Sequence, residues 1–280
     1  MGRGSKDTRM ALTDHQRGII TLLSQQRIER QESYLAGGAA LTVATASPRL
    51  SRDIDLFHDT QDALLSTWED DRRILSSGGY DVEVRRQYPT FVEAFVRRSG
   101  SAVIVQWAVD SAFRFFPLVR DTSALPTLHP FDLATNKTLA LIGRLEPRDW
   151  IDLVDCHDRI QPLGFLCWAA CGKDPGTNPS LIVNEAGRSA RYTQVEVDGL
   201  SFEGRAPNAA ELSVRWKSML AEARAIIAAL PTEEVGTCVL DQKGKLFKGD
   251  REQLSGALSG GRLSFHRGTI RGSIPRFLDS

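Results

Sequence analysis

The 280-residue sequence lacks an excess of charge of either sign, because 35 lysines and arginines balance 35 aspartates and glutamates. It has no run of 18 apolar residues, which argues against a membrane-spanning helix. Its first 14 residues contain no apolar segment of the kind that secretory signals need. A neutral chain can still bind nucleic acid, but only through a local basic patch.

Cysteine is scarce as well. The four cysteines form no Cys-x-x-Cys pair and no pattern with paired histidines, so neither a zinc site nor a disulfide framework is indicated. A reduced, cytoplasmic compartment is the expectation. Hydrophobic residues make up 41% and charged residues 25% of the chain, which favours a folded globular protein over a disordered one.

The first part of the chain alternates between helical and β-like segments. Apolar periodicity and turn residues predict helices over 13–30, 39–46 and 60–76, and strands over 53–57, 81–87, 90–97 and 102–109. Ser99-Gly100-Ser101 is expected to turn a hairpin between the last two strands. This alternation predicts an α+β fold with a mixed sheet, in a first domain over 1–128.

The second part is expected to be mainly helical. Helices are predicted over 131–145, 148–171 and 208–230, followed by a small sheet in the tail. A second domain over 129–280 would then combine a helical part (129–232) with a small, basic, β-rich tail (233–280).

Asp53 and Asp55 are the central candidates for chemistry. In a strand, side chains at i and i+2 emerge from one face, about 6.5–7 Å apart, and Ile54 between them points the other way. Two carboxylates so placed can share a divalent cation, and Mg²⁺ suits a site of few carboxylates and substrate phosphates. The upstream Gly37-Gly38 turn allows close backbone approach to a triphosphate at the start of a helix.

Two segments carry a family resemblance. They are Gly37-Gly38-Ala39-Ala40-Leu41 and Arg49-Leu50-Ser51-Arg52-Asp53-Ile54-Asp55-Leu56-Phe57. They resemble the AbiEii/AbiGii-type toxins of the nucleotidyltransferase superfamily, which has a polymerase-beta-like fold. The resemblance implies that Asp53 and Asp55 bind metal and that Gly37, Gly38 and Ser51 cradle the nucleotide. The chain departs from the family at Ala39, where a hydroxyl residue is usual. The resemblance covers about residues 35–153.

The family's third element is a lysine helix followed by an Arg-Asp-x-x-Asp helix. Here it corresponds to Lys137 and to Arg148-Asp149-Trp150-Ile151-Asp152. The resemblance implies that Asp152 lies near the active site with Lys137 opposite it, and Lys137 can bind phosphates as a point charge. Without the upstream segments, a helix surface with salt bridges would be the preferred explanation of these residues.

The superfamily usually supplies a third acidic ligand from a downstream strand. Asp110, at the end of the strand over 102–109, is the candidate, and it would complete a metal site with Asp53 and Asp55. Two alternatives stay open. Gln106 can occupy the family's position, or Asp110 can cap the following turn.

The tail carries eight basic residues against Asp250 and Glu252, a net of +6 in a neutral chain. Interleaved with aromatics, it can follow a phosphate backbone, or it can be a solvated sheet edge. The pairs Arg85-Arg86 and Arg97-Arg98 add positive charge near the predicted cleft. The eight basic residues of the tail are Lys243, Lys245, Lys248, Arg251, Arg262, Arg267, Arg271 and Arg276.

These observations predict a nucleotidyltransferase that uses Mg²⁺ (or Mn²⁺) and an NTP. The resemblance implies a toxin whose acceptor is RNA, specifically the 3′ end of a tRNA, and whose partner is a cognate antitoxin protein. The alternatives are a small-molecule or protein-hydroxyl acceptor, or a degenerate nucleotide-binding module.

Overall fold

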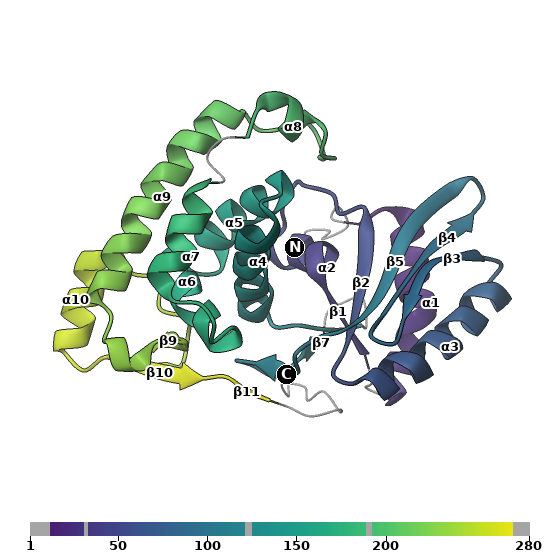
Figure 1. Ribbon diagram of the computed structural model, residues 1–280, viewed down its shortest axis with the longest axis horizontal. Helices are drawn as coiled ribbons and strands as arrows, with labels where there is room; N and C mark the ends of the chain where they lie inside the picture. The colour runs from purple at the N-terminus through teal and green to yellow at the C-terminus, as the bar shows by residue number, and fades with distance from the viewer. Residues whose placement is uncertain (1–11, 31–32, 121–124, 189–191, 271–280) are drawn as a thin grey trace, which may run out of the picture.

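A mixed sheet forms one side of the molecule. The computed structural model describes residues 12–30, 33–120, 125–188 and 192–270, and within them seven strands form this sheet in the order β3-β4-β5-β2-β1-β8-β7 (Figure 1). A mixed sheet was predicted, and it is confirmed. The strands are β1 (Ser33–Ala36), β2 (Asp53–His58), β3 (Asp81–Tyr88), β4 (Phe91–Arg98), β5 (Ser101–Val109), β7 (Val119–Arg120) and β8 (Pro126–Thr127).

The centre of the sheet is the parallel pair β2–β5, and the neighbouring pairs β1–β2, β3–β4 and β4–β5 are antiparallel. The predicted hairpin between β4 and β5 is confirmed, and both Ser99 and Gly100 have positive φ there. Along β2, Ile54 and Leu56 are fully buried, whereas Asp53 and Asp55 are only partly buried. The two faces of β2 therefore separate core residues from candidate site residues, as the alternation predicted.

Two helices cover the core face of the sheet: α1 (Asp14–Arg30) and α3 (Gln61–Ser77). Trp68 of α3 and Trp107 of β5 pack edge to face, with ring centroids 4.7 Å apart. The helix α2 (Gly37–Thr45) begins two residues earlier than expected. Gly37 has φ +63°, a left-handed conformation that glycine adopts without strain, so the chain turns directly from β1 into α2.

A layer of helices lies on the other side of β1 and β2 (Figure 1). One prediction about it was wrong: the single helix expected over 148–171 is two helices. The break falls at Pro162, which has no N–H to donate and therefore begins a new helix rather than continuing the old one. The helices are α4 (Pro130–Arg144), α5 (Pro147–Arg159), α6 (Leu163–Lys173), α7 (Pro179–Ala186), α8 (Gln194–Asp198) and α9 (Ala209–Ala229).

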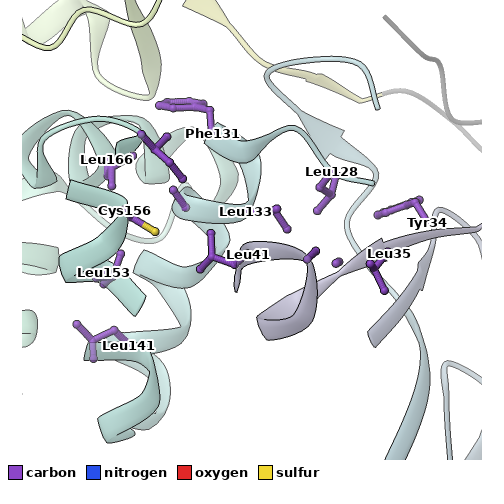
Figure 2. Close-up of a cluster of buried hydrophobic side chains, with 14 of the residues drawn as sticks. Tyr34, Leu35, Leu41, Leu128, Phe131, Leu133, Leu141, Leu153, Cys156 and Leu166 are labelled. Carbon is purple, nitrogen blue, oxygen red and sulfur yellow. The ribbon is translucent and has the colours of Figure 1, made fainter. Parts of the chain in front are cut away.

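One hydrophobic core connects the sheet with this layer. Figure 2 shows Leu35 of β1, Leu41 of α2, Leu133 of α4, Leu153 of α5 and Leu166 of α6 within the same cluster of buried side chains. This packing holds α2 against α4 and α5, and so fixes the glycine turn relative to the lysine helix. The division into domains at residue 128 stays a prediction.

The tail consists of a two-stranded sheet and one helix. The antiparallel strands β9 (Thr237–Asp241) and β10 (Leu263–Arg267) confirm the expected small sheet, but the helix α10 (Arg251–Ser259) between them was not predicted. A 3-10 turn, Thr232–Glu234, precedes β9. The strand β11 (Thr269–Ile270) then pairs with β6 (Phe113–Arg114). Among the described residues, no helix has both the length and the apolar character needed to cross a membrane.

Candidate active site

A cavity of about 530 Å³ lies between the open face of β2 and β5 and the helices α4 and α5. Of the eight predicted site residues, all but Asp152 line this cavity. The structure therefore brings together the glycine turn, the Asp53–Asp55 strand and the lysine helix, which are separate in the sequence. The seven lining residues are Gly37, Gly38, Ser51, Asp53, Asp55, Asp110 and Lys137.

Asp53 and Asp55 face the cavity from β2. The Ser51 hydroxyl donates a hydrogen bond of 2.8 Å to Asp53 Oδ1, and the Arg148 guanidinium lies 3.3 Å from Asp53 Oδ2. Burial and repulsion by Asp53 raise the pKa of Asp55 to about 7, although Lys137, Arg148 and the Gly38 N–H act in the opposite direction. The paired carboxylates are thus incompletely neutralised by the protein itself.

The glycine turn lies directly against Asp55. A β-carbon at residue 37 would be 1.7 Å from Asp55 Oδ2, and one at residue 38 would be 2.8 Å from Ser51 Oγ. Only glycine at both positions leaves this arrangement undisturbed. The turn also places the first backbone N–H groups of α2 at the cavity, where they can serve as donors for an anion.

A buried network of charges forms the wall opposite β2. Lys137 Nζ lies 2.8 Å from Asp149 Oδ1 and 3.0 Å from Asp152 Oδ2. Arg144 binds Asp149 through Nε and an NH group at 2.6 and 2.8 Å. Burial alone would lower the pKa of Lys137, but Asp152 and Asp149 more than offset it, so the pKa is raised. Lys137 therefore stays charged, with two carboxylates already beside it.

Asp152 belongs to this charged network but does not line the cavity. Its two carboxylate oxygens accept hydrogen bonds of 2.5 and 2.9 Å from the Arg49 guanidinium, and its side chain is 2% exposed. Sequence reasoning had noted Arg49 only as part of the family segment. Three cations (Arg49, Lys137, Arg144) against two carboxylates (Asp149, Asp152) leave this wall with a net charge of +1.

The position beside Asp55 on the neighbouring strand belongs to Gln106, which is opposite Asp55 in the parallel β2–β5 register. Asp110 lies four residues further on, or about 13 Å along the strand. Its Oδ1 accepts a hydrogen bond of 2.7 Å from the Ser111 N–H, as a residue that caps a turn does. Within the described part of the chain, no three His, Cys, Asp or Glu side chains lie close enough together to hold a metal ion.

Sequence reasoning also missed Glu93. It lies opposite Gln106 on β4, and Gln106 Nε2 donates a hydrogen bond of 2.9 Å to Glu93 Oε2. Arg86 on β3 binds the same carboxylate at 2.6 Å, and this hydrogen bond is the main cause that lowers the pKa of Glu93. The only signal in the sequence was a charged residue inside an apolar strand, Phe91–Arg98.

In the basic tail, α10, β9 and β10 lie beside α6 and α9, and β11 runs on toward the sheet, where it pairs with β6 (Figure 1). Lys248 Nζ donates to the Arg159 carbonyl, and the Arg262 guanidinium donates to the Gly256 carbonyl. Arg271 and Arg276 lie outside the described residues. The role of the tail in binding nucleic acid stays a prediction.

The residues present fit a divalent cation at Asp53 and Asp55. The two carboxylates share one face of β2, and burial together with repulsion by Asp53 raises the pKa of Asp55. Such a pair gains from an added positive charge, and carboxylate oxygens together with substrate phosphates are the ligands that Mg²⁺ prefers.

Comparison with known proteins finds solved structures with a similar fold. The structure is similar to MenT4, a nucleotidyltransferase toxin from Mycobacterium tuberculosis, with a TM-score of 0.54 and 18% identity over 89% of this chain and 91% of that chain. It is also similar to JHP933 from Helicobacter pylori, with a TM-score of 0.50 and 12% identity over 81% of this chain and 95% of that chain. No curated protein matches the chain in sequence.

Residues 21–225 match the family described as "Nucleotidyl transferase AbiEii toxin, Type IV TA system". The match spans well over half of the chain and contains the glycine turn, the Asp53–Asp55 strand and the charged wall. The chain therefore belongs to the AbiEii family of nucleotidyltransferase toxins and is a nucleotidyltransferase.

Proposed function

We propose that this toxin transfers a nucleoside monophosphate from an NTP to the 3′ end of an RNA, with tRNA as the acceptor and pyrophosphate as the second product. The observation that carries the proposal is the pair Asp53 and Asp55, which faces a cavity bounded by a glycine turn and a cationic wall. A cognate antitoxin protein completes the system, as the toxin–antitoxin family implies.

The triphosphate is best accommodated between the start of α2 and the cationic wall. Gly37 and Gly38 offer backbone N–H groups there, and Ser51 offers a hydroxyl next to them. All four cations contact carboxylates, but Arg49 and Lys137 are buried, whereas the side chains of Arg144 and Arg148 are 43% and 32% exposed. These two arginines are therefore the most accessible partners for phosphate oxygens, with Lys137 adding charge from behind.

Asp53 and Asp55 would hold Mg²⁺, or Mn²⁺ in its place. When bound, the cation supplies neutralisation of charge at the α-phosphate and lowers the pKa of the attacking hydroxyl. Arg148, which contacts Asp53, holds that carboxylate in place and contributes positive charge beside it. Gln106, fixed by Glu93, stands beside Asp55 as a neutral neighbour and so adds no further repulsion.

Asp152 acts in this proposal as a positioning residue. It orients Arg49 by two hydrogen bonds and shares Lys137 with Asp149, so it sets the position of the wall without reaching the cavity. Asp110, directly after β5, also lines the cavity, and we assign it to the part that receives the acceptor or the base of the nucleotide.

The test is the transfer of label from each of the four α-³²P-labelled NTPs to total tRNA in the presence of Mg²⁺. We expect labelled RNA with the wild type and at least about a hundredfold less with Asp55→Ala, since the metal-binding pair is then broken. Asp62→Ala is the matched control, because Asp62 is an exposed aspartate on α3 at the other face of the sheet.

Equal label transfer by the wild type and Asp55→Ala would contradict the proposal. Label that appears on a small molecule or on protein instead of RNA would keep the chemistry and replace the acceptor. Tight NTP binding without any labelled product would favour a degenerate nucleotide-binding module.

A further inference from the structure

The face of β3 and β4 that adjoins the active site carries aromatic side chains that are exposed or partly exposed to solvent. Helices α1 and α3 pack against the other face, where Val92, Ala94 and Val96 are completely buried. On the near face Phe91 and Phe95 remain partly exposed, and Tyr88 is 59% exposed. A solvated face of an antiparallel sheet is expected to carry polar side chains, so three aromatic rings there need an explanation.

Arginines lie over these rings. The guanidinium groups of Arg85 and Arg97 are 4.6 and 4.8 Å from the centre of the Phe95 ring, and that of Arg86 is 5.2 Å from the centre of the Phe91 ring. We call this set the arginine–aromatic platform; it comprises Arg85, Arg86, Tyr88, Phe91, Phe95 and Arg97. Planar cations stacked on exposed rings also offer stacking surfaces for nucleobases.

The platform is continuous with the active site. Phe91 both belongs to the platform and lines the cavity. A row of polar contacts runs beneath it, from Arg86 on β3 through Glu93 on β4 to Gln106 on β5, which stands beside Asp55 on β2. The cross-strand register therefore connects the edge of the sheet to the candidate metal ligands without an intervening element.

We propose that the arginine–aromatic platform binds the unpaired nucleotides that lead to the 3′ hydroxyl of the RNA acceptor. The inference rests on the proposed function, since it assigns a binding surface to that acceptor. Single-stranded RNA is recognised mainly by stacking of bases on aromatic rings and guanidinium planes, which is the chemistry this surface offers. From β3 to β2 the distance is three strand spacings, or about 14 Å, which is enough for two or three nucleotides.

In this proposal, RNA binds to the platform mainly by stacking of its bases and only to a small extent by attraction between its phosphates and the arginines. Arg86 is paired with Glu93, and Arg97 is paired with Glu83, so these cations are already largely neutralised. Arg85 makes no ion pair with any residue in the described part of the chain, and it is the cation available to a phosphate. Binding should therefore depend strongly on the aromatic rings and only weakly on salt.

The experiment measures the Kd of a short, fluorescein-labelled single-stranded RNA, and the KM values for RNA and NTP in the labelling assay. We expect Tyr88→Ala to raise the Kd and the KM for RNA about fivefold or more, with the KM for NTP unchanged. Tyr88→Phe keeps the ring and should behave as the wild type. Because Tyr88 is exposed, neither change threatens the fold, which thermal denaturation verifies.

A second test variant, with a matched control, examines the arginines of the platform. Arg85→Gln should weaken RNA binding and reduce the slope of log K against log salt by about 0.7, the contribution of one phosphate contact. Arg98→Gln is the control, because Arg98 lies over Tyr80, away from the platform.

The outcomes separate the two proposals. If the wild type labels RNA but Tyr88→Ala and Arg85→Gln leave the KM for RNA unchanged, the platform is overturned and the proposed function stands. If the wild type labels no RNA at all, the proposed function fails and the platform fails with it.

Discussion

Gly37 lies so close to Asp55 that a β-carbon at residue 37 would be 1.7 Å from Asp55 Oδ2. The contact joins two segments that the sequence offers as independent signals, a glycine turn and an alternating strand. Residue 37 therefore needs to be glycine for two reasons: its φ is positive, and Asp55 occupies the space of a β-carbon. The backbone of the turn and the candidate metal ligand therefore form one structural unit.

Gly37→Ala should abolish nucleotidyl transfer and lower the free energy of unfolding. The left-handed backbone alone costs about 1–2 kcal/mol for a residue with a β-carbon, and the clash must in addition displace the Asp55 carboxylate. Label transfer and urea denaturation measure the two effects. Gly79→Ala separates them, because Gly79 has φ +78° but open space around it. Comparable activity in the two variants would show that the contact with Asp55 is unimportant.

Asp55→Asn should stabilise the metal-free protein at high pH. The folded pKa of Asp55 is about 7, above the value of about 3.9 for an unfolded chain, so the folded state binds the proton more tightly. Stability from this group is therefore full below about pH 4 and is lost as the pH rises to about 7. In EDTA we expect the variant to gain about 1–3 kcal/mol over the wild type at pH 8, and nothing at pH 4.

Urea denaturation at the two pH values tests this expectation, and added Mg²⁺ provides the control. The cation should stabilise the wild type at pH 8 and have little effect on Asp55→Asn. A difference between the proteins that is independent of pH would mean that neither burial nor Asp53 raises the pKa of Asp55 in the folded state.

The parts of the site that could be predicted from the sequence are those fixed by local geometry. Alternation along β2 was enough to place Asp53 and Asp55 on one face with Ile54 on the other. Helical spacing likewise accounts for Lys137 and Arg144, which are seven residues apart, lie on one face of α4 and both bind Asp149. These relationships depend only on the residue periodicity within one strand or one helix, and not on which elements pack beside it.

The parts that were missed depend on contacts between distant segments. Arg49 and Asp152 are 103 residues apart in the sequence, and no local sequence pattern predicts that they bind each other. The choice between Gln106 and Asp110 was left open by the sequence, because it depends on the register of the parallel strands β2 and β5. That register places Gln106 beside Asp55, and it is set by the packing of the whole sheet. The helix break at Pro162 was missed because the apolar pattern on both sides of it is helical.

The buried pair Arg49–Asp152 should contribute far more to stability than an exposed ion pair. Asp152→Ala leaves the Arg49 guanidinium buried without its partner, which costs about 3–5 kcal/mol. Arg49→Ala should cost a similar amount, and the double variant less than the sum, because the two residues act on each other. The exposed pair Glu185–Arg188 is the matched comparison, with an expected coupling below about 1 kcal/mol. Additive losses at Arg49 and Asp152 in urea denaturation would refute the positioning role of Asp152.

Arg148 should govern affinity for the NTP. Its side chain is 32% exposed, lines the cavity and contacts Asp53, so it is positioned to contact the phosphates beside that carboxylate. We expect Arg148→Gln to raise the KM for NTP about tenfold, the loss of one charge-assisted hydrogen bond, and Arg148→Lys to restore part of it. Arg52→Gln is the control, because Arg52 lies in the same family segment as Asp53 but bonds to Gly199 and Ser201. If both glutamine variants change the KM for NTP equally, Arg148 acts only through the general positive charge of the cleft, and the direct contact with the triphosphate is excluded.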